Sequence, residues 1–116
     1  GVTRAIIVGM MGKLSKMANG KMQTHAAGSE VDMEFLASLA AELSAPDEVV
    51  AAIRQANTAR HVLELCREAG LVGITSLICK KVAEQCQRHA GGKLFVAASL
   101  VDFGGALLGR YPEVHT

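Results

Sequence analysis

The sequence has few aromatic residues, few prolines and little net charge. Its 116 residues include three Phe, one Tyr, no Trp and two Pro. Half of the residues are hydrophobic, so Ala, Leu, Val and Ile must build the core. A formal charge of +1 gives no concentrated basic surface of the kind that nucleic-acid-binding domains use. We therefore expect no nucleic-acid partner.

Long apolar segments are also missing. No run of apolar residues approaches the roughly 18 that a membrane-spanning helix needs, and the first residues lack the charged and apolar regions of a signal peptide. These absences predict a cytoplasmic protein with no membrane partner. The length is that of one ordinary domain, residues 1–116, and leaves the oligomeric state open.

Cysteines are scarce and irregularly spaced. An odd number, Cys66, Cys79 and Cys86, cannot all pair in disulfides. None of the spacings is the Cys-x-x-Cys of zinc or redox sites. Cys79 and Cys86 are seven residues apart and share one face of a predicted helix. We predict reduced cysteines that act as small hydrophobic core residues, and no metal site.

Apolar periodicity and turn residues divide the chain into strands and helices. Strands are predicted at 4–9, 94–101 and 106–109, and helices at 11–18, 32–43, 46–56, 59–69 and 74–89. The run Ile6, Ile7 and Val8 is typical of a buried strand in a parallel sheet. Together these elements predict an α/β fold: a three-layer α/β/α domain with a small, mainly parallel sheet and four to five helices.

The order strand, helices, strand predicts where a ligand would bind. It implies a right-handed crossover and parallel pairing of the first two strands. Ligands of open α/β sheets bind beyond the carboxyl ends of such strands. This places the segment from Gly9 to Lys13 at the crevice, with Asp102 near the same rim.

The most informative segment runs from Arg4 to His25, where an apolar strand leads through Gly9-x-x-Gly12-Lys13 into a helix. Backbone N–H groups and the helix N-terminus can bind an anion there, with charge added by Lys13 and Lys16. The alternative is that the glycines serve helix–strand packing and the lysines form a solvated face. Nucleotide-binding motifs fail on spacing, since Gly-x-Gly-x-x-Gly is absent and Leu14 stands where a P-loop needs Ser or Thr.

The same segment carries a family resemblance. The motif is Gly9-x-x-Gly12-Lys13-Leu14-x-Lys16-x-Ala18-x-Gly20-x-x-x-Thr24-His25. It resembles the core motif of the CbiD family, the cobalt-precorrin-5B C(1)-methyltransferases of anaerobic cobalamin biosynthesis. The resemblance continues through Asp32, residues 35–37, residues 56–59 and residues 105–109, and it matches the C-terminal part of a longer protein. Met10, Ala26 and Met33 depart from the residues usual in the family.

The resemblance implies a function. Family members transfer the methyl group of S-adenosylmethionine to C-1 of a cobalt-containing tetrapyrrole that carries many carboxylates. This chain would then be the C-terminal domain of a two-domain methyltransferase whose N-terminal domain is absent, and we expect it to be inactive alone. The residues expected to bind substrate or cosubstrate are Gly9, Gly12, Lys13, Lys16, Thr24 and His25. No catalytic residue is predicted.

Two alternatives remain open at this point. One is a non-enzymatic α/β module that binds an anionic metabolite or a partner helix. The other is an unrelated nucleotide-dependent enzyme, which the failed motifs disfavour. Each makes a different prediction for the glycine segment, because only the methyltransferase reading requires it to approach a corrinoid or its methyl donor.

Overall fold

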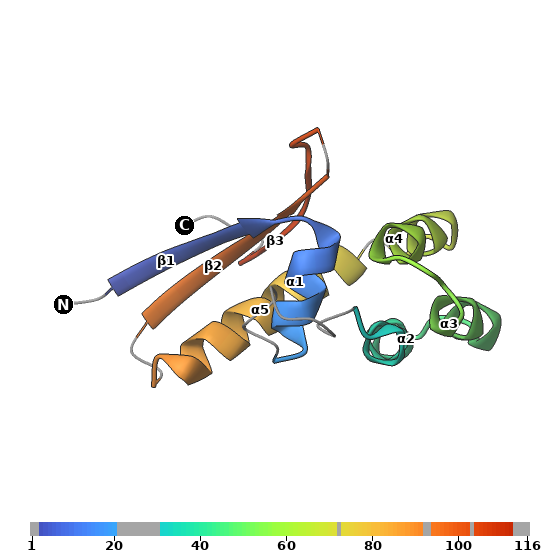
Figure 1. Ribbon diagram of the computed structural model, residues 1–116, viewed down its shortest axis with the longest axis horizontal. Helices are drawn as coiled ribbons and strands as arrows, with labels where there is room; N and C mark the ends of the chain where they lie inside the picture. The colour runs from blue at the N-terminus through green and yellow to red at the C-terminus, as the bar shows by residue number, and fades with distance from the viewer. Residues whose placement is uncertain (1–2, 21–30, 72, 92–93, 103, 113–116) are drawn as a thin grey trace.

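The computed structural model describes residues 3–20, 31–71, 73–91, 94–102 and 104–112, which form a three-stranded sheet and five helices (Figure 1). The elements are β1 (Thr3–Gly9), α1 (Met11–Ala18), α2 (Met33–Glu42), α3 (Asp47–Arg54), α4 (Ala59–Glu68), α5 (Ile74–His89), β2 (Leu94–Val101) and β3 (Leu107–Tyr111). The predicted α/β class is confirmed. None of the described helices is long and apolar enough to cross a membrane.

Local capping signals explain several helix boundaries. The Asp32 side chain accepts a hydrogen bond from the Phe35 backbone N–H at 3.1 Å and starts α2. The Thr58 hydroxyl accepts one from His61 N–H at 3.0 Å and starts α4. Gly20 follows the end of α1 with φ of +84°, a conformation that favours glycine. Residues at these three positions therefore set the boundaries of α1, α2 and α4 locally.

The sheet is mixed, with the strand order β1-β2-β3. β1 pairs with β2 in parallel, as predicted, and Ile6 lies opposite Ala97. β3 pairs with β2 antiparallel, through a tight turn in which the Asp102 carboxylate accepts a hydrogen bond from Ala106 N–H at 2.8 Å. The carboxyl ends of β1 and β2 therefore meet at one edge of the sheet.

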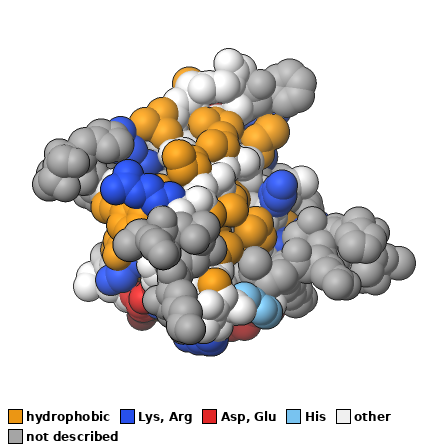
Figure 2. Space-filling view, turned by 90° about the vertical axis from the view of Figure 1, so that its left-hand side faces the viewer, with side chains coloured by type: hydrophobic (Ala, Val, Ile, Leu, Met, Phe, Trp, Pro, Cys, Tyr) orange, Lys and Arg blue, Asp and Glu red, His pale blue; other side chains and the backbone are white. Residues whose placement is uncertain are grey.

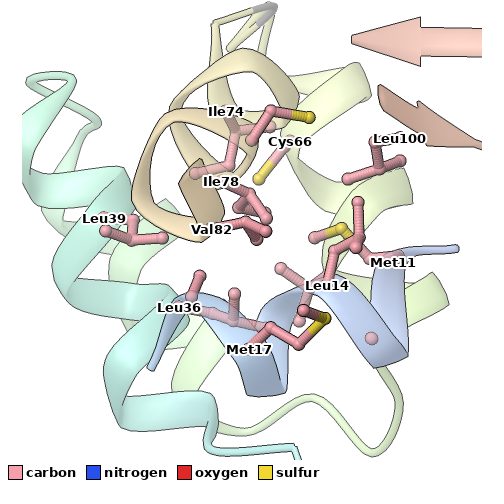
Figure 3. Close-up of a cluster of buried hydrophobic side chains, with 14 of the residues drawn as sticks. Met11, Leu14, Met17, Leu36, Leu39, Cys66, Ile74, Ile78, Val82 and Leu100 are labelled. Carbon is pink, nitrogen blue, oxygen red and sulfur yellow. The ribbon is translucent and has the colours of Figure 1, made fainter. Parts of the chain in front are cut away.

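The hydrophobic core lies between one face of the sheet, here called the inner face, and the helices. Val96, Ala98 and Leu100 of β2 point into it and are buried. Figure 3 shows side chains of α1, α5 and β2 converging there, among them Leu14, Ile78 and Leu100. The Thr75 hydroxyl on α5 donates a hydrogen bond to the Leu108 carbonyl at 2.7 Å, which ties the helix to β3.

The three cysteines are unpaired and buried in this core, which agrees with their predicted structural role. Burial raises the pKa of the Cys66 and Cys86 thiols above the ordinary value. Desolvation also raises the pKa of Cys79 to about 11. All three are therefore neutral thiols near pH 7 and poor nucleophiles.

The opposite face, here called the outer face, differs from the prediction. Ile6 is 73% exposed and Val8 56% exposed, although the sequence predicted a buried strand, and Phe95 on β2 is 45% exposed. All five described helices lie on the other side of the sheet (Figure 1). The reason is topological, because these helices belong to the single crossover between β1 and β2, whereas β2 and β3 are joined by a turn. The described residues therefore form two layers, without the second helical layer of the expected α/β/α arrangement.

Candidate functional site

A pocket of about 490 Å³ opens at the carboxyl ends of β1 and β2. This is the edge where the strand order predicted a ligand site, and its volume is typical of small-molecule pockets. Four segments line it: Met10 to Gly12 at the start of α1, one side of α4, the end of β2 with the following turn, and Leu108 of β3. Segments far apart in the sequence therefore meet at one place.

The two glycines of the Gly9-x-x-Gly12 segment have different surroundings. A Cβ atom placed on Gly9 would lie 3.0 Å from Leu14 Cδ2, which is closer than side chains normally pack. A Cβ atom placed on Gly12 would meet nothing within 4 Å. Helix–strand packing therefore explains Gly9 but does not explain Gly12, which faces open space in the pocket.

The N-terminus of α1 presents backbone donors at this pocket. Met10 is the N-cap residue, and its side chain makes no capping hydrogen bond. The first N–H groups of any helix have no acceptor within the helix, so those of Met11 and Gly12 can donate to a ligand. The helix dipole adds partial positive charge at the same end. These groups suit a carboxylate or another anion.

Charged side chains of α4 line the opposite wall. They are Arg60, Glu64 and Arg67, one or two turns apart on one side of the helix. Arg60 Nε lies 3.8 Å from Glu64 Oε1, a long and exposed ion pair that contributes little to stability. Among the described residues Arg67 has no ion-pair partner, and it is therefore the wall's best placed cation for an anionic ligand.

Apolar side chains complete the pocket and leave room for a ligand with a hydrophobic body. They are Met10, Met11, Leu63, Val101 and Leu108. Asp102 also lies at the rim, as expected, but its carboxylate is engaged by the turn before β3. The described residues contain no cluster of three or more His, Cys, Asp or Glu side chains that could hold a metal ion. The pocket thus combines apolar walls with a few donors and cations.

The structure brings together only some of the residues predicted for the site. Gly12 lines the pocket and Gly9 lies just before it at the end of β1. Lys13 is exposed and Lys16 is half-buried on α1, and neither contributes to the pocket wall. Thr24 and His25 lie outside the described residues. Met10 lies in the pocket wall, so its departure from the residue usual in the family changes a side chain that lines the site.

The arginines of α4 were not predicted as site residues. Arg60 and Arg67 are seven residues apart, with Glu64 between them, which is the spacing of one helix face. The same spacing is typical of a solvated helix surface. Nothing in the local sequence indicates that α4 packs beside the ends of β1 and β2. The spacing of the two arginines therefore could not show that they line a pocket.

Comparison with known proteins identifies the family. Residues 23–112 match the family model described as CbiD, C-terminal domain. This chain belongs to the CbiD family. A relative from Leptospira interrogans, named cobalt-precorrin-5B C(1)-methyltransferase, is 49% identical over 109 residues, which are 94% of this chain and 30% of the relative. That match takes in the Gly9 to Lys16 segment, which the family model leaves out.

Other CbiD relatives agree in name and extent. A protein of Leptospira borgpetersenii with the same name is 46% identical over 95% of this chain and 30% of its own length. Another from Rubrobacter xylanophilus is 44% identical over 89% of this chain and 26% of its own length. The chain therefore spans less than a third of the length of these relatives. No solved structure matches it.

Proposed function

We propose that this chain is the C-terminal part of an enzyme that transfers the methyl group of S-adenosylmethionine to C-1 of cobalt-precorrin-5B in anaerobic cobalamin biosynthesis. The observation that carries the proposal is the 49% identity, over nearly the whole chain, to a protein named for this reaction. A cytoplasmic location and S-adenosylmethionine as the methyl donor are parts of the same proposal. The cobalt belongs to the substrate.

The pocket beside Gly12 fits one end of such a ligand. A tetrapyrrole with carboxylate side chains and the methionine part of S-adenosylmethionine both present a carboxylate, although the second also carries an ammonium and a sulfonium charge. The N–H groups of Met11 and Gly12 would bind that carboxylate, and Arg67 would neutralise it from α4. Met10, Leu63 and Leu108 would exclude water from the ligand body.

Methyl transfer would require this chain mainly to hold a ligand in the correct position. When bound, the methyl donor supplies an electrophilic carbon on a sulfonium sulfur, which leaves as a neutral thioether. Transfer is fast when that carbon is held in line with the nucleophilic ring carbon. Backbone donors on a helix terminus are suited to this task because they are fixed by the fold. Lys13 and Lys16, outside the pocket wall, would act on carboxylates at the rim, and Thr24 and His25 stay proposed as loop contacts.

A titration with a matched pair of variants tests the proposal. Backbone amide NMR of the chain with S-adenosylhomocysteine, and separately with a carboxylate-bearing cobalt corrinoid, should shift the signals of residues 10–13 with at least one of the two. Gly12→Val should weaken that binding about tenfold or more, since its side chain enters the pocket. Gly73→Ala, which lines a different pocket and is in ordinary contact with Leu43, should leave it unchanged.

The possible results separate the alternatives. Shifts with the corrinoid alone would assign the pocket to the substrate, and shifts with S-adenosylhomocysteine alone would assign it to the donor. Binding of neither ligand, together with tight binding of an unrelated anion or a nucleotide, would contradict the methyltransferase proposal for this pocket. Methyl transfer by a full-length protein that carries this chain is the corresponding activity assay, and Gly12→Val should lower its kcat/KM.

A further inference from the structure

The outer face of the sheet is an apolar surface with a polar margin. Residues of β1 and β2 that lie opposite one another in the parallel register share a face, so Ile6 and Ala97 are neighbours, as are Val8 and Ser99. Phe95 lies opposite Arg4, whose guanidinium carbon is 5.8 Å from the ring centre. In Figure 2 hydrophobic side chains gather in the upper half of the view, where Figure 1 places the strands.

This exposure is unusual for a parallel strand pair. Parallel strands are almost always covered on both faces, and for that reason they carry continuous apolar runs. β1 has such a run in Ile6, Ile7 and Val8, although Ile7 alone of these three packs against the described core. A strand with one solvent-exposed face would alternate apolar and polar residues instead. The sequence of β1 is therefore that of a strand buried on both sides.

The comparisons indicate what covers the face. The matched family model is a C-terminal domain, and the matched Leptospira relatives have most of their length outside the match. The matches to these relatives take in at least 109 of the 116 residues, so their unmatched N-terminal length would join this domain close to β1, whose outward side chains form the centre of the patch. An apolar centre with Arg4, Ser99 and Arg110 around it is also the usual make-up of a protein interface.

We propose that the outer face, centred on Ile6, Val8 and Phe95, is the docking surface for the N-terminal part of the full-length CbiD protein, which would meet it with an apolar surface of its own. The inference depends on family membership and goes beyond the proposed methyl transfer. It assigns the two faces of one sheet to different tasks, since the inner face builds this domain and the outer face joins it to the rest of the enzyme.

Side-chain footprinting tests the proposal without any activity assay. Hydroxyl-radical labelling of Phe95 and Ile6 is compared between the isolated chain and a full-length protein in which this chain replaces the matched part of the Leptospira interrogans relative. The isolated chain is also measured after mixing with that relative's N-terminal part. Labelling of both residues should fall about fivefold or more in at least one of the two formats, whereas exposed His61 on α4 serves as the reference.

Variants give a second readout. Ile6→Thr combined with Val8→Thr keeps β-branched side chains and should leave the thermal stability of the isolated chain nearly unchanged. In the full-length protein the same pair should restore labelling of Phe95 and lower the unfolding temperature, whereas Ala51→Thr on exposed α3 should leave the labelling of Phe95 unchanged. Unchanged labelling in both formats would overturn the proposal. Protection of Phe95 in a discrete dimer of the isolated chain, separated from larger aggregates by size-exclusion chromatography, would also overturn it, by assigning the face to a second copy.

Discussion

The two faces of the sheet have similar side chains and opposite environments. Val96 on the inner face is 1% exposed, whereas Val8 on the outer face of the neighbouring strand is 56% exposed. Burial of apolar surface stabilises a fold only where it removes that surface from water. The inner face therefore carries the stability of this chain, and the outer face contributes almost none. Apolar residues on the inner face stabilise this chain, whereas those on the outer face are available for contact with another surface. The same substitution made on each face should therefore have different effects on stability.

The largest difference is expected for isoleucine. Ile78 on α5 is fully buried beneath the inner face, and Ile78→Ala should lower the free energy of unfolding by about 2–5 kcal/mol through lost burial and a cavity. Ile6→Ala on the outer face should cost less than about 1 kcal/mol, because Ile6 is 73% exposed. Urea denaturation of both variants measures the difference. Equal losses would mean that the outer face is already covered in the isolated chain.

Glycine gives the next largest effect. A Cβ atom on Gly109, on the inner face of β3, would lie 2.6 Å from Thr75 Cβ and 2.9 Å from Ser76 N, so α5 would have to move. Gly109→Ala should therefore destabilise the chain by about 1–3 kcal/mol. Gly12→Ala, in open space on α1, should instead be neutral or stabilise by up to about 1 kcal/mol. If urea denaturation showed that Gly12→Ala lowers the free energy of unfolding, this glycine would be required for packing.

Polar side chains should show a smaller contrast. Thr75→Val removes the hydroxyl that donates to the Leu108 carbonyl and should cost about 0.5–1.5 kcal/mol, because the acceptor stays buried between α5 and β3. Ser99→Ala, on the outer face, should change stability by less than about 0.5 kcal/mol. Thermal unfolding of the two variants and of Thr75→Ser, which keeps the donor, measures these differences. A neutral Thr75→Val would show that the hydroxyl does not hold α5 to the sheet.

The last difference appears only at high pH. The Cys79 thiol has its pKa raised by burial from 9.0 to about 11, so the folded chain retains this proton where the unfolded chain loses it. Its stabilising contribution is complete below pH 9 and is lost as the pH rises toward 11. The difference in free energy of unfolding between the chain and Cys79→Ala should therefore narrow over this window. A difference that is independent of pH would contradict the buried, neutral state of the thiol.

Much of the fold follows from local sequence signals. Asp32 and Thr58 cap helices that begin close to the predicted positions, Gly20 follows a helix that ends at the predicted residue, and the apolar runs give the strands. The exposure of Ile6 could not be predicted, because an apolar run suits a strand covered by its own helices as well as one covered, as proposed above, by another part of a longer protein. A local apolar pattern predicts that a residue will be buried, but it does not predict which segment of the protein will cover it.

The candidate site was predictable in place but not in composition. Strand order alone put Gly12 and Asp102 at one edge, and both line the pocket there. Gly9 and Gly12 are equivalent in the motif, and only the position of Leu14 separates a packing glycine from one that faces open space. The position of Arg67 in the pocket wall depends on how α4 packs beside the ends of β1 and β2, which the local sequence does not show.

The position of β1 at the edge of the sheet has a practical consequence. Among the described strands β1 has a neighbour on one side, β2, so the backbone groups on its other side are available to pair with another strand. Combined with two exposed β-branched side chains, this edge is a template on which further chains can add in register. We therefore expect the isolated chain to be lost to aggregation at high concentration, and its production together with the proposed N-terminal part to be the more dependable route to soluble material.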